Sequence, residues 1–156
     1  MRRADGFTLI ELMVTVAMVA VLATLAVSGY SRLIEGARLA TAAGDLRADL
    51  ELAKLTAIRR HVTVLAYFNG GAGKNGSYTL WVDTKDGEEI LTRTMPEKVL
   101  LTTGTPPIGF NTMGIASATG QIEVHTTDNA KYKRISVSAA GNIKTERSTD
   151  GTHWEG

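Results

Sequence analysis

The chain has 156 residues, of which 44% are hydrophobic and 21% charged, a composition typical of a folded protein with room for one globular domain. Its formal net charge is +1 at pH 7, and removal of residues 1–6 would leave a side-chain charge of zero, because that segment holds two arginines and one aspartate. The chain therefore has no global positive field to attract nucleic acid or acidic lipid. It contains no cysteine, which excludes disulfides and thiolate metal sites.

The N-terminal part of the sequence is a long apolar segment with one acid near its start. After Glu11 the next charged residue is Arg32, and positions 12–31 are 20 uncharged residues. A helix of that length, with a rise of about 1.5 Å per residue, matches a hydrocarbon core of roughly 30 Å. An ionised acid in this setting costs at least about 2.5 kcal/mol on insertion scales, so Glu11 is expected to have a cation as a partner.

Two other interpretations of this segment are a secretory signal peptide and a plain membrane anchor. Arg2 and Arg3 before an apolar run, with small residues at Ala26 and Ser28 as a cleavage site, fit the general form of a signal peptide. The apolar region of a signal peptide is about 7 to 15 residues long and contains no acid, so the fit is poor. A plain anchor would leave Glu11 unexplained.

Apolar residues continue at helical spacing over residues 32–60, with charged residues between them. The pattern predicts that the N-terminal helix continues to the end of this range and packs one face against a sheet. Gly36 and Gly44 each lower helix stability by about 1 kcal/mol relative to alanine, and the Ser28–Gly29 pair is a recognised type of kink site. The positions expected to be buried are Leu39, Ala42, Ala43, Leu46, Leu50, Ala53 and Ala57.

From His61 onward, short β-rich runs alternate with glycine and polar turns, which predicts an antiparallel sheet. Turns are expected at Asp86–Gly87, Asp128–Asn129 and Gly141–Asn142, and a loop with two adjacent prolines at Thr102–Gly109. Apolar and polar residues alternate in the last strands, so one face is expected to be packed and the other solvated. The predicted strands are Val62–Phe68, Tyr78–Asp83, Ile90–Arg93, Gln121–Thr126, Tyr132–Ser138 and Ile143–Arg147.

Sequence motifs for nucleotide binding and catalysis are incomplete. Residues Gly71–Gly76 fit the pattern G-x-G-x-x-G, but a predicted strand follows them, whereas a dinucleotide site requires a helix there to hold the pyrophosphate. The three histidines lack metal-ligand spacing, and the sequence has no G-x-S-x-G nucleophile motif. We therefore expect a protein that is not an enzyme and that uses no cofactor and no metal.

The run Gly6-Phe7-Thr8-Leu9-Ile10-Glu11 behind a short basic leader resembles type IV prepilins and type II secretion pseudopilins. The resemblance implies that a prepilin peptidase cleaves between Gly6 and Phe7 on the cytoplasmic side and methylates the new amino group of Phe7. It also implies that Glu11 pairs with the terminal amine of a neighbouring subunit during assembly. The physical argument agrees, because the new ammonium supplies the cation that the carboxylate requires.

Later landmarks narrow the resemblance to the GspH/FimT type of minor pseudopilin. They are the helix end at residues 53–60 before a strand, the run Phe110-Asn111-Thr112-Met113-Gly114, and Arg134-Ile135-Ser136-Val137 followed by Gly141. The implied fold is α+β and pilin-like, with a long N-terminal helix packed on an antiparallel β-sheet domain. The expected divisions are a cleaved leader at 1–6, a transmembrane half-helix at 7–31, an amphipathic half-helix at 32–60 and a β domain at 61–156.

The function implied by this resemblance is that of a structural subunit of a type II secretion pseudopilus or a type IV pilus, acting in filament initiation or at the tip. The expected partners are other pilin or pseudopilin subunits, the prepilin peptidase and the membrane. The expected location is the bacterial inner membrane, crossed once, with the globular domain in the periplasm, and then the filament.

The alternative function is that of a DNA-binding minor pilin, since some relatives in natural transformation bind DNA through basic residues near the C-terminal strands. Asn142 follows Gly141 here, in place of a basic residue, and most basic clusters are solvated faces. DNA binding would require several cations to converge on one surface. The candidate residues are Lys131, Lys133, Arg134, Lys144 and Arg147.

Overall fold

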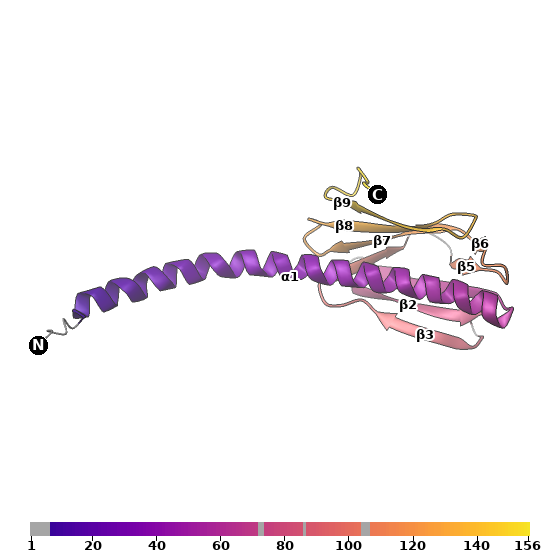
Figure 1. The fold of residues 1–156 in the computed structure, drawn as a ribbon, viewed down its shortest axis with the longest axis horizontal. Helices are drawn as coiled ribbons and strands as arrows, with labels where there is room; N and C mark the ends of the chain where they lie inside the picture. The colour runs from indigo at the N-terminus through magenta and orange to yellow at the C-terminus, as the bar shows by residue number, and fades with distance from the viewer. Residues whose placement is uncertain (1–6, 72–73, 86, 104–106) are drawn as a thin grey trace, which may run out of the picture. The chain divides into compact units, whose positions relative to one another are not determined.

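The computed structural model describes residues 7–71, 74–85, 87–103 and 107–156, and the side chains of residues 25–29, 32, 71, 74 and 103 lie outside that description. Within these residues one helix, α1 (Leu9–Arg60), precedes strands β1 to β9 (Figure 1). The chain divides into two compact units, Met1–Ile34 and Glu35–Gly156. Since the boundary falls inside α1, the helix contributes to both units.

In the first unit, the described residues form the beginning of α1. The helix includes Ser28 and Gly29 without a break in its secondary structure. Every large apolar side chain described between Phe7 and Leu22 is exposed, from 48% for Val14 to 84% for Phe7. Among the residues that the structure describes, no helix has the length and apolar character needed to cross a membrane.

In the second unit, α1 buries the face that its sequence predicts. All seven predicted positions between Leu39 and Ala57 are at most 4% exposed, and they share one core with apolar side chains of the strands. This confirms that the second half of the helix packs on β-structure. The helix ends at Arg60, because His61 has a positive φ of 54°, which helical backbone does not adopt.

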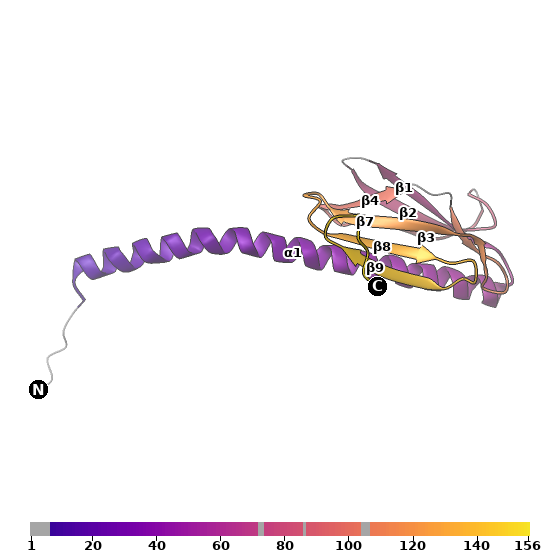
Figure 2. The same cartoon turned by 90° about the horizontal axis from the view of Figure 1, so that it is seen from above.

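The described strands confirm the predicted antiparallel β region and divide it into two sheets. The five-stranded sheet has the order β3-β2-β1-β5-β6 and the four-stranded sheet the order β4-β7-β8-β9 (Figures 1 and 2). The alternating residues Ile122 and Val124 of β7, and Ile135 and Val137 of β8, are buried as their spacing predicts. The strands are β1 (Val64–Gly71), β2 (Lys74–Val82), β3 (Glu89–Thr94), β4 (Val99–Thr103), β5 (Ile108–Phe110), β6 (Ala116–Ala118), β7 (Gly120–Thr126), β8 (Tyr132–Val137) and β9 (Ile143–Ser148).

Three of these strands, β4, β5 and β6, lie where the sequence predicted none. The expected loop at Thr102–Gly109 is wrong at both ends, because its first two residues belong to β4 and its last two to β5, while residues 104–106 lie outside the described part. Ile108 and Phe110 are fully buried, and β5 pairs with β1. Tertiary burial of this kind stabilises strands that are too short for a recognisable alternation in sequence.

The glycine-rich segment Gly71–Gly76 lies in the hairpin between β1 and β2. Lys74 already belongs to β2 and pairs with Gly71, while residues 72 and 73 lie outside the described part. A strand therefore follows the glycines, as the sequence predicted, and not the helix that a dinucleotide site requires. Of the turn predicted at Asp86–Gly87, Asp86 also lies outside the described residues.

A buried acid ties the second half of α1 to the five-stranded sheet. Asp49 is 5% exposed, accepts a hydrogen bond of 2.7 Å from the Tyr78 hydroxyl of β2, and forms an ion pair with Arg93 of β3. Burial, followed by the hydrogen bond to Asp49, raises the pKa of the Tyr78 hydroxyl above its usual value. Because a buried carboxylate without partners is strongly destabilising, these contacts fix how the helix sits on β2 and β3.

Candidate functional site

The first candidate site is the start of α1, where Glu11 lies in the first turn. One carboxylate oxygen of Glu11 accepts hydrogen bonds from the Thr8 backbone N–H at 2.9 Å and from the Thr8 hydroxyl at 2.8 Å. The Glu11 N–H donates in return to the Thr8 hydroxyl at 3.3 Å. This reciprocal arrangement is a capping box, and its signal, Thr-x-x-Glu at a helix start, was present in the sequence but missed.

The capping box gives Glu11 a role within its own chain. Thr8 supplies two donors to the carboxylate, so the acid does not depend on a second subunit to be hydrogen-bonded. The predicted cleavage site is only partly visible, because Phe7 is described and 84% exposed while Gly6 lies outside the described residues. Phe7 adjoins Thr8, so the capping box lies next to the residue that cleavage would make the first of the chain.

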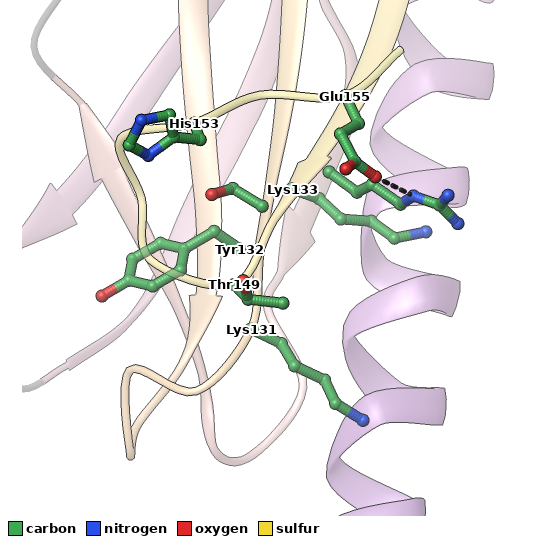
Figure 3. A pocket seen from close by; sticks show the side chains of 8 residues that line it. Lys131, Tyr132, Lys133, Thr149, His153 and Glu155 are labelled. Atoms are coloured by element: carbon green, nitrogen blue, oxygen red, sulfur yellow. Dashed lines mark ion pairs between the residues drawn. The ribbon is translucent and has the colours of Figure 1, made fainter.

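The second candidate site is a cavity of about 440 Å³ beside the ends of β8 and β9 (Figure 3). We call it the basic cavity, because three of the five predicted DNA contacts line it. The remaining lining residues supply aromatic rings, hydroxyl groups and one carboxylate. The cations and hydroxyls can bind an anion, whereas the Glu155 carboxylate opposes one. Its lining residues are Lys131, Tyr132, Lys133, Arg147, Ser148, Thr149, His153 and Glu155.

The structure does not bring all five predicted cations to one surface. Side chains alternate along β8, so Lys133 lies on the face of the buried Ile135, and Arg134 lies on the opposite face. Arg147 pairs with Lys133 in register and shares its face, whereas Lys144 pairs with Ser136 on the face of Arg134. The Lys131 and Lys133 side chains point toward α1 in Figure 3, and those of Tyr132 and His153 point away from it.

Two of the five cations are engaged in contacts within the chain. Arg134 donates to Glu146 at 3.1 Å and its guanidinium lies 3.9 Å from the centre of the Trp154 ring. Arg147 forms an ion pair of 3.4 Å with Glu155. Within the described part of the chain, no ion pair forms at the other three, which are Lys131, Lys133 and Lys144.

A C-terminal tail, residues 149–156, borders the basic cavity. Arg147 and Glu155 exchange two backbone hydrogen bonds of 2.8 and 2.9 Å, so the tail adds one antiparallel bridge to the outer edge of β9. The tail thereby places its own carboxylate in the cavity. Among the described residues, no group of three or more His, Asp or Glu side chains lies close enough to hold a metal ion.

The chain has a long helix whose first half is apolar and exposed and whose second half packs on antiparallel sheets. This arrangement defines a pilin-like subunit. The prokaryotic N-terminal methylation motif matches residues 1–27, and the family described as type II transport protein GspH matches residues 42–141. The chain belongs to the GspH family. The GspH match ends at Gly141, so Lys144, Arg147 and the C-terminal tail lie beyond it.

Solved structures show the same fold. The minor pilin FimU of Pseudomonas aeruginosa, in space group P21, is 15% identical with a TM-score of 0.55, covering 70% of this chain and 89% of FimU. The minor pseudopilin EpsH of the Vibrio cholerae type 2 secretion system is 13% identical with a TM-score of 0.54, covering 69% of this chain and 95% of EpsH. At these identities the likeness shows the fold alone. No curated protein sequence matches the chain.

Proposed function

We propose that this chain is a minor pseudopilin or minor pilin, a subunit of a type II secretion pseudopilus or a type IV pilus that acts in filament initiation or at the tip. The observation that carries the proposal is the N-terminal methylation motif at residues 1–27 on the same chain as a GspH domain at residues 42–141. The fold shared with a minor pilin and a minor pseudopilin supports both kinds of filament. The role is structural and involves no catalysis.

In this proposal the chain is a substrate of prepilin peptidase. The enzyme removes residues 1–6 and methylates Phe7, and residues 7–31 anchor the chain once in the inner membrane with its second unit in the periplasm. The uncharged run at residues 12–31 supports the anchor, because its length matches a hydrocarbon core of roughly 30 Å. The cations of the leader then remain in the cytoplasm, in agreement with the positive-inside rule.

Assembly in this proposal depends on the charge of Glu11. The capping box holds the Glu11 carboxylate at the start of α1, where it meets the methylated amine of a neighbouring subunit. Pairing of the two charges in an apolar environment lowers the free energy of the assembled state relative to a subunit that is out of register.

Mass spectrometry and two substitutions test the processing and the assembly. The mature chain is expected to begin with a methylated Phe7, and an intact Met1 or a start near Gly29 would overturn the assignment.

Glu11→Gln keeps an oxygen that can accept a hydrogen bond from Thr8 but removes the charge, so this variant is expected to be processed normally and to fail to assemble. Thr8→Ala is the matched control, because it removes the capping hydroxyl and keeps the charge. Assembly of Glu11→Gln at the parental level would exclude charge pairing.

The position in the filament is tested by labelling and deletion. Antibodies against the second unit are expected to mark filament ends, and deletion of the gene is expected to lower the number of filaments more than their length. Label along the whole shaft would identify a major subunit instead. Both outcomes are read by electron microscopy of the same cells.

DNA binding is a second candidate function, and the basic cavity is the observation that favours it. Lys131 and Lys133 line the cavity and share one face of the sheet, where they offer cations for phosphate. A Lys131→Ala/Lys133→Ala variant is expected to lose binding in a gel shift, whereas Arg134→Ala/Lys144→Ala, on the opposite face, is expected to retain it. Equal binding by the parent and both variants, at any salt concentration, would exclude this function for the cavity.

A further inference from the structure

The basic cavity reaches α1 at Gly36, a residue without a side chain. A Cβ added to Gly36 would lie 2.6 Å from Lys131 Nζ, so the ammonium group occupies the space that a side chain would take. Gly36 comes three residues before Leu39, the first of the seven buried positions of the helix. Both Lys131 and Lys133 point toward the helix in Figure 3. The two lysines therefore lie beside α1 just before the point where the core begins.

Gly36 also follows closely on the uncharged run at residues 12–31. The first charge after that run is Arg32, and Gly36 lies four residues further on, a rise of about 6 Å in a helix. Tyr30, at the end of the run, is 67% exposed, and tyrosine is enriched where a helix leaves the hydrocarbon core. The headgroup region on each side of a bilayer is about 5–8 Å thick. When the run spans a bilayer, Gly36 therefore lies at the level of the lipid headgroups.

The cavity keeps an excess of positive charge. Arg147 is neutralised by its ion pair with Glu155 of the C-terminal tail. Neither Lys131 nor Lys133 forms an ion pair within the residues that the structure describes. Asp128, the acid nearest to them in the sequence, accepts hydrogen bonds within its own turn. Two lysines on one face therefore remain available to an anion.

The charges of α1 next to Gly36 are paired with the segment that leads into β4. Glu35 forms an ion pair of 2.7 Å with Lys98, and Arg38 forms one of 3.8 Å with Glu97. Each pair contributes no net charge. Among the side chains described around this part of α1, the two lysines of the cavity therefore set the sign of the surface.

We propose that the basic cavity binds the phosphate group of an anionic phospholipid in the membrane that holds the chain. The inference rests on the proposed function, which places residues 7–31 in the inner membrane. Two ammonium groups that face one phosphodiester form charge-assisted hydrogen bonds with it. The position of the cavity favours lipid over DNA as the source of that phosphate, because headgroups surround the chain at the level of Gly36 as long as it is anchored.

The lipid contact acts before the subunit enters a filament. Each basic residue near an anionic membrane surface strengthens binding to that surface by about fivefold. The two lysines therefore hold the end of the second unit that contains Gly36 against the headgroups. Extraction of the subunit from the membrane breaks this contact.

Photo-crosslinking of the full chain in nanodiscs tests the contact. The discs contain phosphatidylcholine alone or a mixture with phosphatidylglycerol, and a benzophenone amino acid replaces Thr149, which lines the cavity and is exposed. Mass spectrometry then detects lipid attached to the chain. The probe at Thr149 is expected to form a lipid adduct that requires phosphatidylglycerol.

Two further probe positions serve as controls. Thr92, on β3, is exposed, and its neighbour Arg93 contacts Asp49, which lies about 20 Å further along α1 than Gly36. A probe at Thr92 is expected to form no lipid adduct. A probe at Val14, within the uncharged run, is expected to form an adduct in both kinds of disc, because it reports on the anchor alone.

Substitution of the lysines tests the charge argument on the same adduct. Lys131→Ala/Lys133→Ala is expected to lower the adduct yield at Thr149 at least about fivefold, and Lys131→Arg/Lys133→Arg is expected to preserve it. The matched control, Arg59→Ala/Lys144→Ala, removes the same charge away from the cavity and is expected to leave the yield unchanged. Arg59 lies 23 residues beyond Gly36 on α1, and Lys144 lies on the opposite face of the sheet. Thermal unfolding confirms that each variant is folded.

The outcomes separate this inference from the proposed function. Equal yields at Thr149 in the two kinds of disc, or in the parent and the alanine variant of the lysines, would overturn the inference, and so would an equal loss in the matched control. If the probe at Val14 forms an adduct and the probe at Thr149 does not, the inference fails and the anchor stands. If the probe at Val14 forms none, the anchor fails and the inference fails with it. Loss of DNA in the gel shift without loss of the adduct would assign the lysines to nucleic acid instead.

Discussion

The two halves of α1 share one secondary structure but differ in where their apolar side chains go. In the first unit the described large apolar residues of the helix are all exposed, whereas in the second unit seven apolar residues of the helix form a stripe that is buried in the core. Helix formation is therefore compatible with both patterns, and the distribution of apolar residues decides which half packs within the chain. Among the described residues, the first half contributes no side chain to the buried core, and the second half carries the helix's share of that core.

Truncation of a core residue is expected to have the largest effect. Leu46 is fully buried, so Leu46→Ala removes buried methyl groups and leaves a cavity, and it is expected to destabilise the second unit by about 2–5 kcal/mol. Leu12→Ala is the control, since Leu12 is 61% exposed. Urea unfolding in detergent measures both variants. An equal loss of stability in the two variants would contradict the conclusion that only the second half of α1 carries the core.

Removal of the Tyr78 hydroxyl is expected to have the next largest effect. Tyr78→Phe leaves Asp49 with one partner fewer and is expected to cost about 1.5–3 kcal/mol, because the lost hydrogen bond involves a charged group. The raised pKa of Tyr78 also predicts a pH dependence. Above about pH 10 the unfolded chain releases this proton and the folded chain keeps it, so stability falls as the pH rises.

Urea unfolding at pH 8 and pH 11 measures this dependence. Tyr78→Phe is expected to lose less stability between the two pH values than the parent. An equal loss in the two proteins would show that Tyr78 does not contribute to the alkaline transition.

Two glycines give a smaller, matched comparison. Gly114 has a positive φ and lies against Ile58, so Gly114→Ala is expected to destabilise the second unit by about 1–2 kcal/mol. Gly44 lies in α1 with no atom within 4 Å of an added Cβ, so Gly44→Ala is expected to stabilise by about 0.5–1 kcal/mol. Thermal unfolding shows whether each variant is more or less stable than the parent. A change in midpoint temperature of the same sign in both variants would contradict the geometry of the turn at Gly114.

The smallest effect is expected at the C-terminal tail. Trp154→Ala removes the ring beneath the Arg134 guanidinium and is expected to cost about 0.5–1 kcal/mol, the range for an exposed cation–π contact. Trp81→Ala, on β2, provides a comparison without that contact. Hydrogen exchange of the Glu155 amide measures the effect locally, and unchanged protection would show that the stack does not hold the tail.

Periodicity in the sequence was sufficient to predict the helix, its buried stripe and the last three strands. The stripe from Leu39 to Ala57 repeats for five turns, and that length makes the signal strong. Strands β5 and β6 have three residues each, which is too short for a period, so their existence depends on pairing partners distant in sequence. The apolar stripe also gave no sign that Asp49 is buried, because its partners Tyr78 and Arg93 are supplied by the sheet.

The candidate sites were predictable only in part. The first-turn position of Glu11 was evident, but its bond to Thr8 required attention to the spacing of the two residues. Lys133 and Arg134 are adjacent in sequence, so alternation alone places them on opposite faces of a strand. The contact between the tail and Arg147 is not encoded in any local pattern, because it joins β9 to residues beyond a turn.

The bridge between Arg147 and Glu155 has a practical consequence for anyone who fuses a tag to this protein. β9 is an edge strand, and the tail occupies part of its free side. Only one residue, Gly156, would separate an affinity tag joined to it from Glu155, so a flexible spacer is advisable to keep the tag from disrupting the bridge. Deletion of residues 149–156 would expose the unpaired edge of β9. Because an exposed strand edge can pair with strands of other molecules, the shortened protein is expected to aggregate.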